Sequence, residues 1–263
     1  MNKTFPELER PSFSVQDLIQ LLEKHYGLCC KLEELPGERD QNFLAREKKG
    51  ETYVLKISNP CETLELLQIQ NNAFERSAKL LKKGEIPKVI PNKNGESLSR
   101  IISKDGVHHW IRLVEYIDGM PMAEYRPHSR DFLMELGSMC GAVTKALHEI
   151  PAPPPSRKLL WEMHNVEETL EEYMPWIKDK KLLGWVKNSL DLYSRTIEPH
   201  ESKLRRGWIH NDFNDYNVLV VPKINGSPGL GLIDFGDITH SYLIAEPAVD
   251  ADKDVDEIGR AHV

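Results

Sequence analysis

The chain has 263 residues, of which 40% are hydrophobic and 29% charged, and its formal net charge is -7. A chain of this length and composition can bury a substantial core as one large domain or as two lobes, which excludes the disordered, collagen-like and coiled-coil classes. The negative charge argues against a surface built to neutralise a nucleic-acid backbone, so we expect no nucleic-acid partner.

Neither export nor membrane insertion is indicated. The first residues, MNKTFPELERPSFS, contain no apolar signal region, and no apolar run is long enough to span a bilayer. The four cysteines, Cys29, Cys30, Cys61 and Cys140, have neither the density of a disulfide scaffold nor the spacing of a zinc site. We therefore expect a cytoplasmic protein with reduced, packed cysteines and no membrane partner. The sequence leaves the oligomeric state open.

The first part of the chain predicts an antiparallel sheet with helices. SVQDLIQLLEKHYG, from Ser14 to Gly27, predicts a capped amphipathic helix, and LCCKLEEL, QNFLAR and TYVLKIS predict three strands in a meander. An apolar-periodic helix from about Glu62 to Lys83 follows. KVIPNKNG and SRIISKDGVHHWIRLVEYI then predict turns and two more strands before Gly119.

Helices dominate after Gly119. SRDFLMELGSMCGAVTKALHEI predicts a long helix that stops at PAPPPS, and residues 161–204 predict two or three further helices, broken at Pro175 and Gly184. A hairpin with the turn KINGSPG leads into the strand LGLIDFGD. We therefore predict an α+β chain with a small antiparallel sheet lobe (1–114), a hinge (115–119) and a mainly helical lobe (120–249).

Polar residues interrupt two apolar runs in WIHNDFNDYNVLV, residues 208–220. His210, Asp212 and Asn217 form the pattern H-x-D-x(4)-N directly before an apolar strand. Such a loop can present Asp212 to a hydroxyl as a proton acceptor, while Asn217 offers its side-chain oxygen to a metal ion. On its own, the pattern is equally typical of a solvated turn, because Asn and Asp favour turns.

A second polar motif favours the catalytic interpretation. In GLIDFGD, Asp234 stands at the end of an apolar strand, where a carboxylate has little structural reason to be unless it binds something. Two hairpin strands that end in Asn217 and Asp234 supply two oxygen ligands for Mg²⁺, which completes its octahedron with water and substrate phosphate. The alternative is a half-exposed carboxylate at a hairpin end.

Lys56 is the predicted contact to the phosphates of a nucleotide. Strand alternation in TYVLKIS places Val54, Lys56 and Ser58 on one face, just before a long helix. The alternative is a solvated lysine on an edge strand. The helix would supply a carboxylate that orients the lysine, for which Glu65 is our first choice and Glu62 the second.

The loop LPGERDQNF contains a single glycine, Gly37, and matches neither a Walker A motif nor the full glycine-rich loop of kinases. Its exposed amides are able to cover phosphates, and a plain hairpin turn explains the loop equally well. Asn42, in the same stretch, is a further candidate contact to the nucleotide.

Taken in order, Lys56, the loop from His210 to Asn217 and Asp234 resemble the aminoglycoside phosphotransferase and choline kinase branch of the protein-kinase-like fold, over residues 12–249. Within it, LPGERDQNF, TYVLKISNP, LLQIQNN, HNDFNDYNVLV, LIDFGD and AEPAV are most similar to the hydroxylysine kinases. The resemblance implies transfer of the terminal phosphate of GTP, or ATP, to the side-chain hydroxyl of 5-hydroxy-L-lysine. A kinase for choline, ethanolamine or methylthioribose and a non-catalytic nucleotide-binding protein are the alternatives.

The resemblance also implies roles in catalysis, in nucleotide binding and in Mg²⁺ coordination. Asp212 would be the catalytic base, and His210 would brace the loop. The residues that would bind the nucleotide are Lys56, Asn42, Glu65, Glu115 and Ile117, of which the last two would read the purine through the backbone of the hinge. Asn217 and Asp234 would coordinate Mg²⁺. Two positions depart from the family pattern. Asn211 replaces the glycine of H-G-D, and Gln68 stands where hydroxylysine kinases tend to have an acid.

The end of the sequence also departs from the family. Members continue past E-x-A into an apolar helix, whereas VDADKDVDEIGRAHV is polar. The last seven residues, 257–263, can be encoded by a DNA sequence that resembles a sequencing-library adapter, so we expect a truncated chain whose residues 250–263 lie outside the family. We expect the missing helices to leave apolar surface uncovered and the chain inactive or poorly stable.

Overall fold

The computed structural model describes residues 10–82, 84–151, 159, 162–222 and 228–248. Within it the chain divides after Gly119 into two compact units. This border falls at the end of the segment predicted as a hinge, and the hinge function itself stays a prediction. The tail 250–263 and most of the predicted turn KINGSPG lie outside the described residues.

Helix α1 (Val15–Tyr26) opens the first unit, as predicted. The Ser14 hydroxyl accepts a hydrogen bond from the Asp17 N–H at 3.2 Å, which satisfies one of the amides left unpaired at a helix start. Gly27 ends the helix with φ 74°, in the left-handed region that glycine adopts at little cost.

Six antiparallel strands form the sheet of the first unit, in the order β1-β2-β3-β6-β4, with β5 also paired to β6. The strands are β1 (Cys30–Leu35), β2 (Gln41–Glu47), β3 (Thr52–Ile57), β4 (Val89–Ile90), β5 (Ser99–Ile102) and β6 (His108–Glu115). The predicted meander of the first three strands is confirmed.

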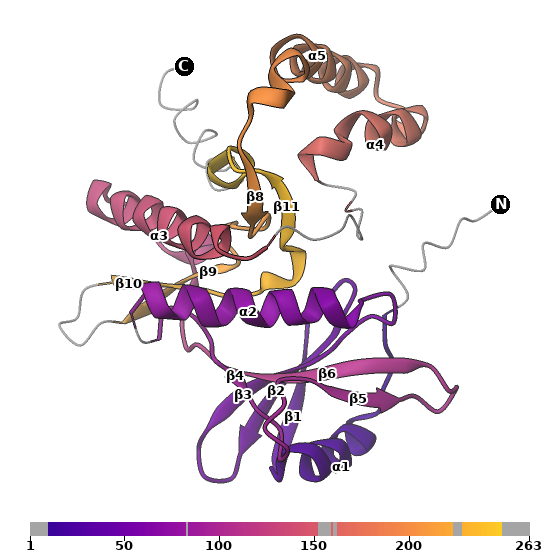
Figure 1. Cartoon of the computed structure of the whole chain (residues 1–263), viewed down its shortest axis with the longest axis vertical. Coiled ribbons are helices and arrows are strands. Elements are labelled where there is room, and N and C mark those ends of the chain that lie inside the picture. The colour runs from indigo at the N-terminus through magenta and orange to yellow at the C-terminus, as the bar shows by residue number, and fades with distance from the viewer. Residues whose placement is uncertain (1–9, 83, 152–158, 160–161, 223–227, 249–263) are drawn as a thin grey trace. The chain divides into compact units, whose positions relative to one another are not determined.

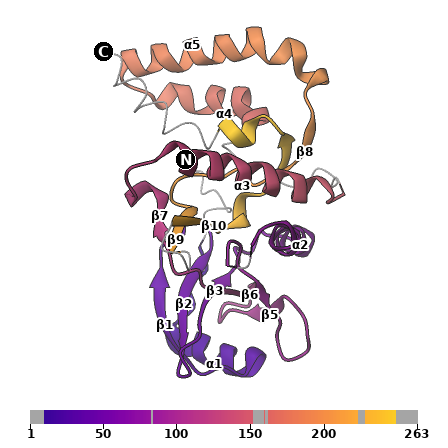
Figure 2. The same ribbon diagram turned by 90° about the vertical axis from the view of Figure 1, so that its left-hand side faces the viewer.

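The two faces of this sheet are covered by different helices (Figures 1 and 2). Leu18 and Leu22 of α1 pack with Leu55 and other side chains of one face into a buried core, and each such side chain contributes about 1.5–3 kcal/mol. Helix α2 (Leu64–Leu80) covers the other face. It is shorter than predicted because the Thr63 hydroxyl accepts the Leu66 N–H and starts the helix there.

The second unit holds two small antiparallel sheets, β10-β9-β7 and β11-β8, together with helices. Its strands are β7 (Met120–Pro121), β8 (Arg206–Ile209), β9 (Val218–Pro222), β10 (Pro228–Leu232) and β11 (Thr239–Tyr242). Its α-helices are α3 (Arg130–His148), α4 (Val166–Tyr173) and α5 (Lys180–Thr196), and its 3-10 turns are η2 (Met122–Glu124), η3 (Met163–Asn165), η4 (Met174–Trp176), η5 (Glu198–Lys203) and η6 (Phe235–Asp237).

The prediction that a helix breaks at Gly184 is wrong, because α5 runs through this residue. A glycine inside a helix costs about 1 kcal/mol. Asp179, which accepts the N–H groups of Lys181 and Leu182, offsets a similar amount as the helix cap. Helices α4 and α5 run alongside each other (Figures 1 and 2), and the Ser194 hydroxyl donates to Glu167 at 3.0 Å.

The packing predicted for the cysteines is half right, since Cys30 and Cys140 are buried whereas Cys29 and Cys61 are exposed. None of the helices in the described ranges is long and apolar enough to cross a membrane.

Candidate functional site

The predicted catalytic loop, residues 210–217, runs from β8 to β9, and residues 233–238 run from β10 to β11. Because β8 pairs with β11 and β9 pairs with β10, the two segments are held side by side. The Ile233 N–H donates to the Asn217 carbonyl at 3.0 Å, one residue before Asp234. The fold therefore brings the two polar motifs of the sequence together within the second unit.

His210 is fully buried and joins the two segments. Its Nδ1 accepts the Asp212 N–H at 3.3 Å, and its Nε2 lies 3.1 Å from the Ile233 carbonyl. An amide only donates and a carbonyl only accepts, so these contacts select the neutral imidazole with its proton on Nε2. The ring of Phe235 packs against the imidazole in an edge-to-face arrangement, with ring centroids 4.6 Å apart, and restrains it further.

Asp212 is held by two asparagine side chains. Its Oδ1 accepts from Asn214 Nδ2 at 2.5 Å, and its Oδ2 accepts from Asn217 Nδ2 at 2.6 Å. Burial raises the pKa of Asp212 to about 6, helped by the charges of Asp237 and Asp234 and opposed by these two hydrogen bonds. A carboxylate whose pKa lies closer to neutrality is a better proton acceptor near pH 7.

Asn214 and Asp237 are site residues to which the sequence analysis gave no role. The side-chain Oδ1 of Asn214 accepts the N–H groups of Tyr216 and Asn217, so this side chain shapes the turn while its Nδ2 orients Asp212. Asp237 exerts the largest charge effect on Asp212. The only local signal for Asn214 in the sequence is its position two residues after the candidate base, and Asp237 has no local signal.

Two oxygens at the ends of the hairpin strands suit a divalent cation. Asn217 directs its amide nitrogen to Asp212, which leaves its Oδ1 as the atom able to bind a cation. The backbone of Asp234 has φ 58°, a left-handed conformation that is rare for residues other than glycine and common at functional sites. The Oδ1 of Asp234 accepts the Gly236 N–H at 3.0 Å.

The donor set fits Mg²⁺ bound together with a nucleotide. Among the described residues, no three His, Cys, Asp or Glu side chains gather closely enough to hold a metal by themselves. Mg²⁺ commonly takes only one or two protein oxygens and completes its shell with water and substrate phosphate.

A buried carboxylate that the sequence analysis missed supports the start of the loop. Glu246 is fully buried, and its Oε2 accepts the N–H of His210 and, at 3.4 Å, the N–H of Asn211. Asn211 has φ 64°, in the left-handed region that Asn tolerates better than most residues. The turn in this chain is thus formed with Asn in place of the glycine of the family pattern.

Lys56 lies in the middle of the sheet of the first unit. It is 6% exposed and stands on β3, between β2 and β6. Asn42 and Arg112 are directly opposite on these neighbours, and directly opposite residues of antiparallel strands share a face. The interpretation of Lys56 as a solvated edge residue is therefore wrong, and the predicted face is confirmed.

Arg112 is a second cation on this face that the sequence analysis did not single out. It is fully buried. Its Nη1 donates to Asn71 of α2 at 3.0 Å, and its guanidinium lies 5.8 Å from the ring centre of Phe74. An arginine inside the apolar strand HHWIRLVE was the signal available.

The glutamates proposed to orient Lys56 have different surroundings. Glu65 is exposed in the first turn of α2. Glu62 is shielded and forms an ion pair with Arg39 at 3.2 Å. The contact of either glutamate with Lys56 stays a prediction, as does a role for Gln68, which is exposed on the same helix.

The first two main-chain N–H groups of the predicted hinge, residues 115–119, already donate hydrogen bonds to other segments of the first unit. The Glu115 N–H donates to the Lys88 carbonyl at 2.8 Å, and the Tyr116 N–H donates to the Thr52 carbonyl at 3.2 Å. Reading of a purine by this backbone would therefore fall to the carbonyl of Glu115 and the N–H of Ile117. That role stays a prediction.

Comparison with known proteins identifies the class. The family model described as the phosphotransferase enzyme family (APH) matches residues 31–255. The hydroxylysine kinase of Mus musculus is 29% identical, over 91% of this chain and 69% of the relative. The hydroxylysine kinase of Danio rerio is 24% identical, over 91% of this chain and 70% of the relative.

Among solved structures, that of a microcompartment-associated aminopropanol kinase is similar, with a TM-score of 0.69 and 16% identity. The match covers 90% of this chain and 74% of the other. The predicted fold class, an antiparallel sheet lobe with a mainly helical lobe in the kinase-like arrangement, is confirmed.

Proposed function

This chain belongs to the phosphotransferase enzyme family, and we propose that it transfers the terminal phosphate of GTP or ATP to the side-chain hydroxyl of 5-hydroxy-L-lysine. It is a small-molecule phosphotransferase that acts on a hydroxyl group. The choice of acceptor is supported by its similarity to two hydroxylysine kinases over 91% of the chain. The cytoplasm is the proposed location.

The observation that carries the mechanism is the environment of Asp212. Its two oxygens face the amides of Asn214 and Asn217, and its pKa is raised to about 6. At pH 7 most of the carboxylate is ionised, yet its proton affinity is higher than that of an exposed aspartate. We assign Asp212 as the base that takes the proton of the acceptor hydroxyl, with His210 holding the loop against the segment of Asp234.

The remaining residues position the donor. Asn217 and Asp234 would hold Mg²⁺, which, when bound, neutralises charge on the donor phosphates. Lys56 would contact phosphates of the donor as a point charge, with Asn42 opposite it on β2, and the backbone of Glu115 and Ile117 would read the base. Catalysis of this kind consists mainly of positioning and charge neutralisation, so no covalent enzyme intermediate is required.

A panel of acceptors and donors tests this proposal. Transfer from γ-labelled GTP and ATP would be measured with 5-hydroxy-L-lysine, choline, ethanolamine and methylthioribose, in the presence and absence of Mg²⁺. L-lysine is the matched control, because it lacks only the hydroxyl. We expect Mg²⁺-dependent transfer to hydroxylysine and none to lysine.

Each other result would count against a different part of the proposal. Transfer to choline, ethanolamine or methylthioribose in place of hydroxylysine would contradict the acceptor. Nucleotide binding without transfer to any acceptor would favour a non-catalytic nucleotide-binding protein.

A further inference from the structure

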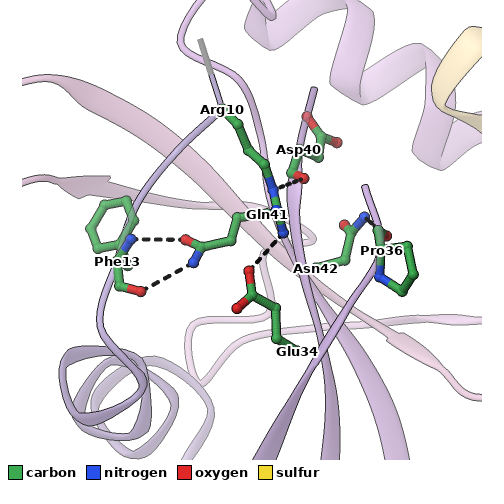
Figure 3. Close-up of polar contacts among 7 residues, drawn as sticks. All are labelled: Arg10, Phe13, Glu34, Pro36, Asp40, Gln41 and Asn42. Atoms are coloured by element: carbon green, nitrogen blue, oxygen red, sulfur yellow. Dashed lines mark hydrogen bonds and ion pairs between the residues drawn. The ribbon is translucent and has the colours of Figure 1, made fainter. Parts of the chain in front are cut away.

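The turn between β1 and β2, residues 36–40, is contacted by two separate segments of the chain, and Figure 3 shows the contacts of the first. One segment precedes α1, and the other follows β3, the strand that carries Lys56. A hairpin turn normally needs little beyond its own backbone to form. The contacts around this turn therefore call for a separate explanation.

Gln41 makes the central contact on the side of the N-terminal segment, residues 10–13. The Phe13 N–H donates to Gln41 Oε1 at 2.8 Å, and Gln41 Nε2 donates to the Phe13 carbonyl at 3.1 Å. Gln41 is 5% exposed, so these bonds are shielded from water. Figure 3 shows the Gln41 side chain pointing from the start of β2 toward Phe13.

Arg10 extends the same attachment. Its Nε donates to the Asp40 carbonyl at 3.1 Å, and its Nη2 lies 2.7 Å from Glu34 Oε1 (Figure 3). One guanidinium thus contacts the strand before the turn and the last residue of the turn. These two side chains hold the N-terminal segment against the strands on both sides of the turn.

The segment after β3 holds the turn from another direction. Asp40 Oδ1 accepts the Asn59 N–H at 2.9 Å. Arg39 forms the ion pair with Glu62, and their side chains are 16% and 9% exposed. Asn59 follows Lys56 by three residues, so the turn is coupled to the strand of the proposed phosphate contact.

The backbone of the turn is itself tightly closed. A Cβ added at Gly37 would lie 2.5 Å from the Asp40 carbonyl oxygen and 2.7 Å from Asn42 Nδ2. Asn42 Nδ2 donates to the Pro36 carbonyl at 3.3 Å. Only glycine fits at this position in the observed conformation of the turn.

We propose that Gln41 is a positioning residue for the phosphate donor. Its amide fixes the N-terminal segment beside the turn, and this clamp restrains the turn, whose main-chain amides would contact the donor phosphates. A loop fixed before binding does not lose that freedom when the ligand arrives, so affinity is higher. The inference rests on the proposed function, since it assumes that the nucleotide binds beside this turn.

The test compares two amide clamps in the same unit. Gln41→Leu removes both bonds to Phe13 at nearly constant volume. Asn92→Leu is the matched control, because Asn92 is also buried and its amide shapes another turn, accepting the N–H groups of Asn94 and Glu96 and donating to Ser99. Affinity for fluorescent GTP and ATP analogues would be measured by titration of the 263-residue chain, with the melting temperature recorded for each variant.

We expect Gln41→Leu to weaken nucleotide binding about tenfold, because the turn must then lose its conformational freedom when the nucleotide binds. The KM for the acceptor should stay unchanged. Asn92→Leu should lower the melting temperature and leave nucleotide affinity as it was. Arg10→Met removes a partly exposed contact to the turn, and we expect it to weaken binding by a smaller factor without loss of the fold.

Three results would overturn the inference. The first is unchanged affinity in both Gln41→Leu and Arg10→Met, and the second is equal weakening by Asn92→Leu. If Gln41→Leu does not fold, Arg10→Met alone decides. The third result, no nucleotide binding by the unmodified chain, would overturn the proposed function and this inference with it.

Discussion

Asp212 is surrounded by groups that act on its proton in opposite directions. Two amides stabilise its charge, whereas burial and two neighbouring carboxylates oppose ionisation. The balance places its pKa at about 6, near neutrality but below it. This suits a group that must be ionised before the reaction and protonated during it.

We expect Asp212→Asn to lower kcat by about a hundredfold to ten-thousandfold, the usual contribution of a positioned base. The measurement is steady-state phosphate transfer at saturating GTP and hydroxylysine, with circular dichroism to verify the fold. Asp215→Asn makes the same change three residues later in the loop, at an aspartate to which neither catalysis nor Mg²⁺ binding is assigned. This control should retain most of its turnover, and full turnover in Asp212→Asn would refute the assigned base.

The titration of Asp212 gives a second prediction, made for the nucleotide-free chain. We expect its carboxyl carbon, followed by NMR, to titrate near pH 6, and at lower pH in Asp237→Asn, because that variant removes the charge that raises the pKa of Asp212 most. The folded state holds this proton more tightly than the unfolded state does. Asp212 therefore removes stability as pH rises from about 4 to about 6. Titration near 4 in the unmodified chain would contradict the prediction.

Between elements, the loop depends on a residue that lies beyond β11. Glu246 accepts the N–H groups at the point where β8 becomes the loop. Backbone amides buried without an acceptor are costly, and a charged acceptor stabilises them more than a neutral one does. The conformation of Asn211 and the position of Asp212 therefore depend on this distant carboxylate.

We expect Glu246→Gln to reduce the free energy of unfolding by about 1 kcal/mol, the difference between a charged and a neutral acceptor. It should also reduce kcat more than the KM for the nucleotide, because the loop carries the base. Urea unfolding and steady-state kinetics measure the two effects. Glu198→Gln, at an exposed position of η5, should change neither. A variant as active and stable as the original would argue against this role of Glu246.

A substitution in helix α5 is expected to stabilise the chain, in contrast to Glu246→Gln. Nothing lies within 4 Å of a Cβ added at Gly184, so Gly184→Ala should raise the free energy of unfolding by about 0.5–1 kcal/mol. Gly37→Ala is the contrasting variant and should destabilise the chain, because its Cβ would meet the Asp40 carbonyl at 2.5 Å. Thermal unfolding measures both. A loss of stability in Gly184→Ala would mean that α5 does not continue through this residue.

At the scale of the whole molecule, the second unit exposes an apolar stripe on α5. Leu182, Trp185 and Leu192, which lie on one side of the helix by their spacing, are 46%, 58% and 60% exposed. Within the described part of the chain, α5 has no buried residue. Exposed apolar patches of this kind favour association.

We expect the chain to self-associate through this stripe. The double variant Trp185→Lys/Leu192→Lys should shift the chain toward the monomer in sedimentation velocity, because charged side chains resist burial. Lys187→Glu, a charge change in the same helix, should leave the distribution as it is. A monomeric unmodified chain would contradict the prediction.

The sequence alone determined those features whose signal is local. Ser14 and Gly27 mark the two ends of α1, the alternation in TYVLKIS placed Lys56 on its face, and the strand-end position of Asp234 marked the second polar motif. Gly184 misled because one glycine costs little against a capped helix. Local sequence patterns predict a helix end or a strand face correctly where residues that are neighbours along the chain determine the conformational free energy.

Only the tertiary structure decided which distant residues lie together within each unit. Arg112 donates to Asn71, which lies 41 positions earlier in the sequence. Glu246 accepts the N–H groups of His210 and Asn211, which lie 36 and 35 positions before it, and Gln41 pairs with Phe13, 28 positions before it. Such contacts leave no period or spacing in the sequence, because they arise when strands and helices pack. The packing also set the pKa of Asp212, since burial and the charges of Asp234 and Asp237 act through space and not along the chain.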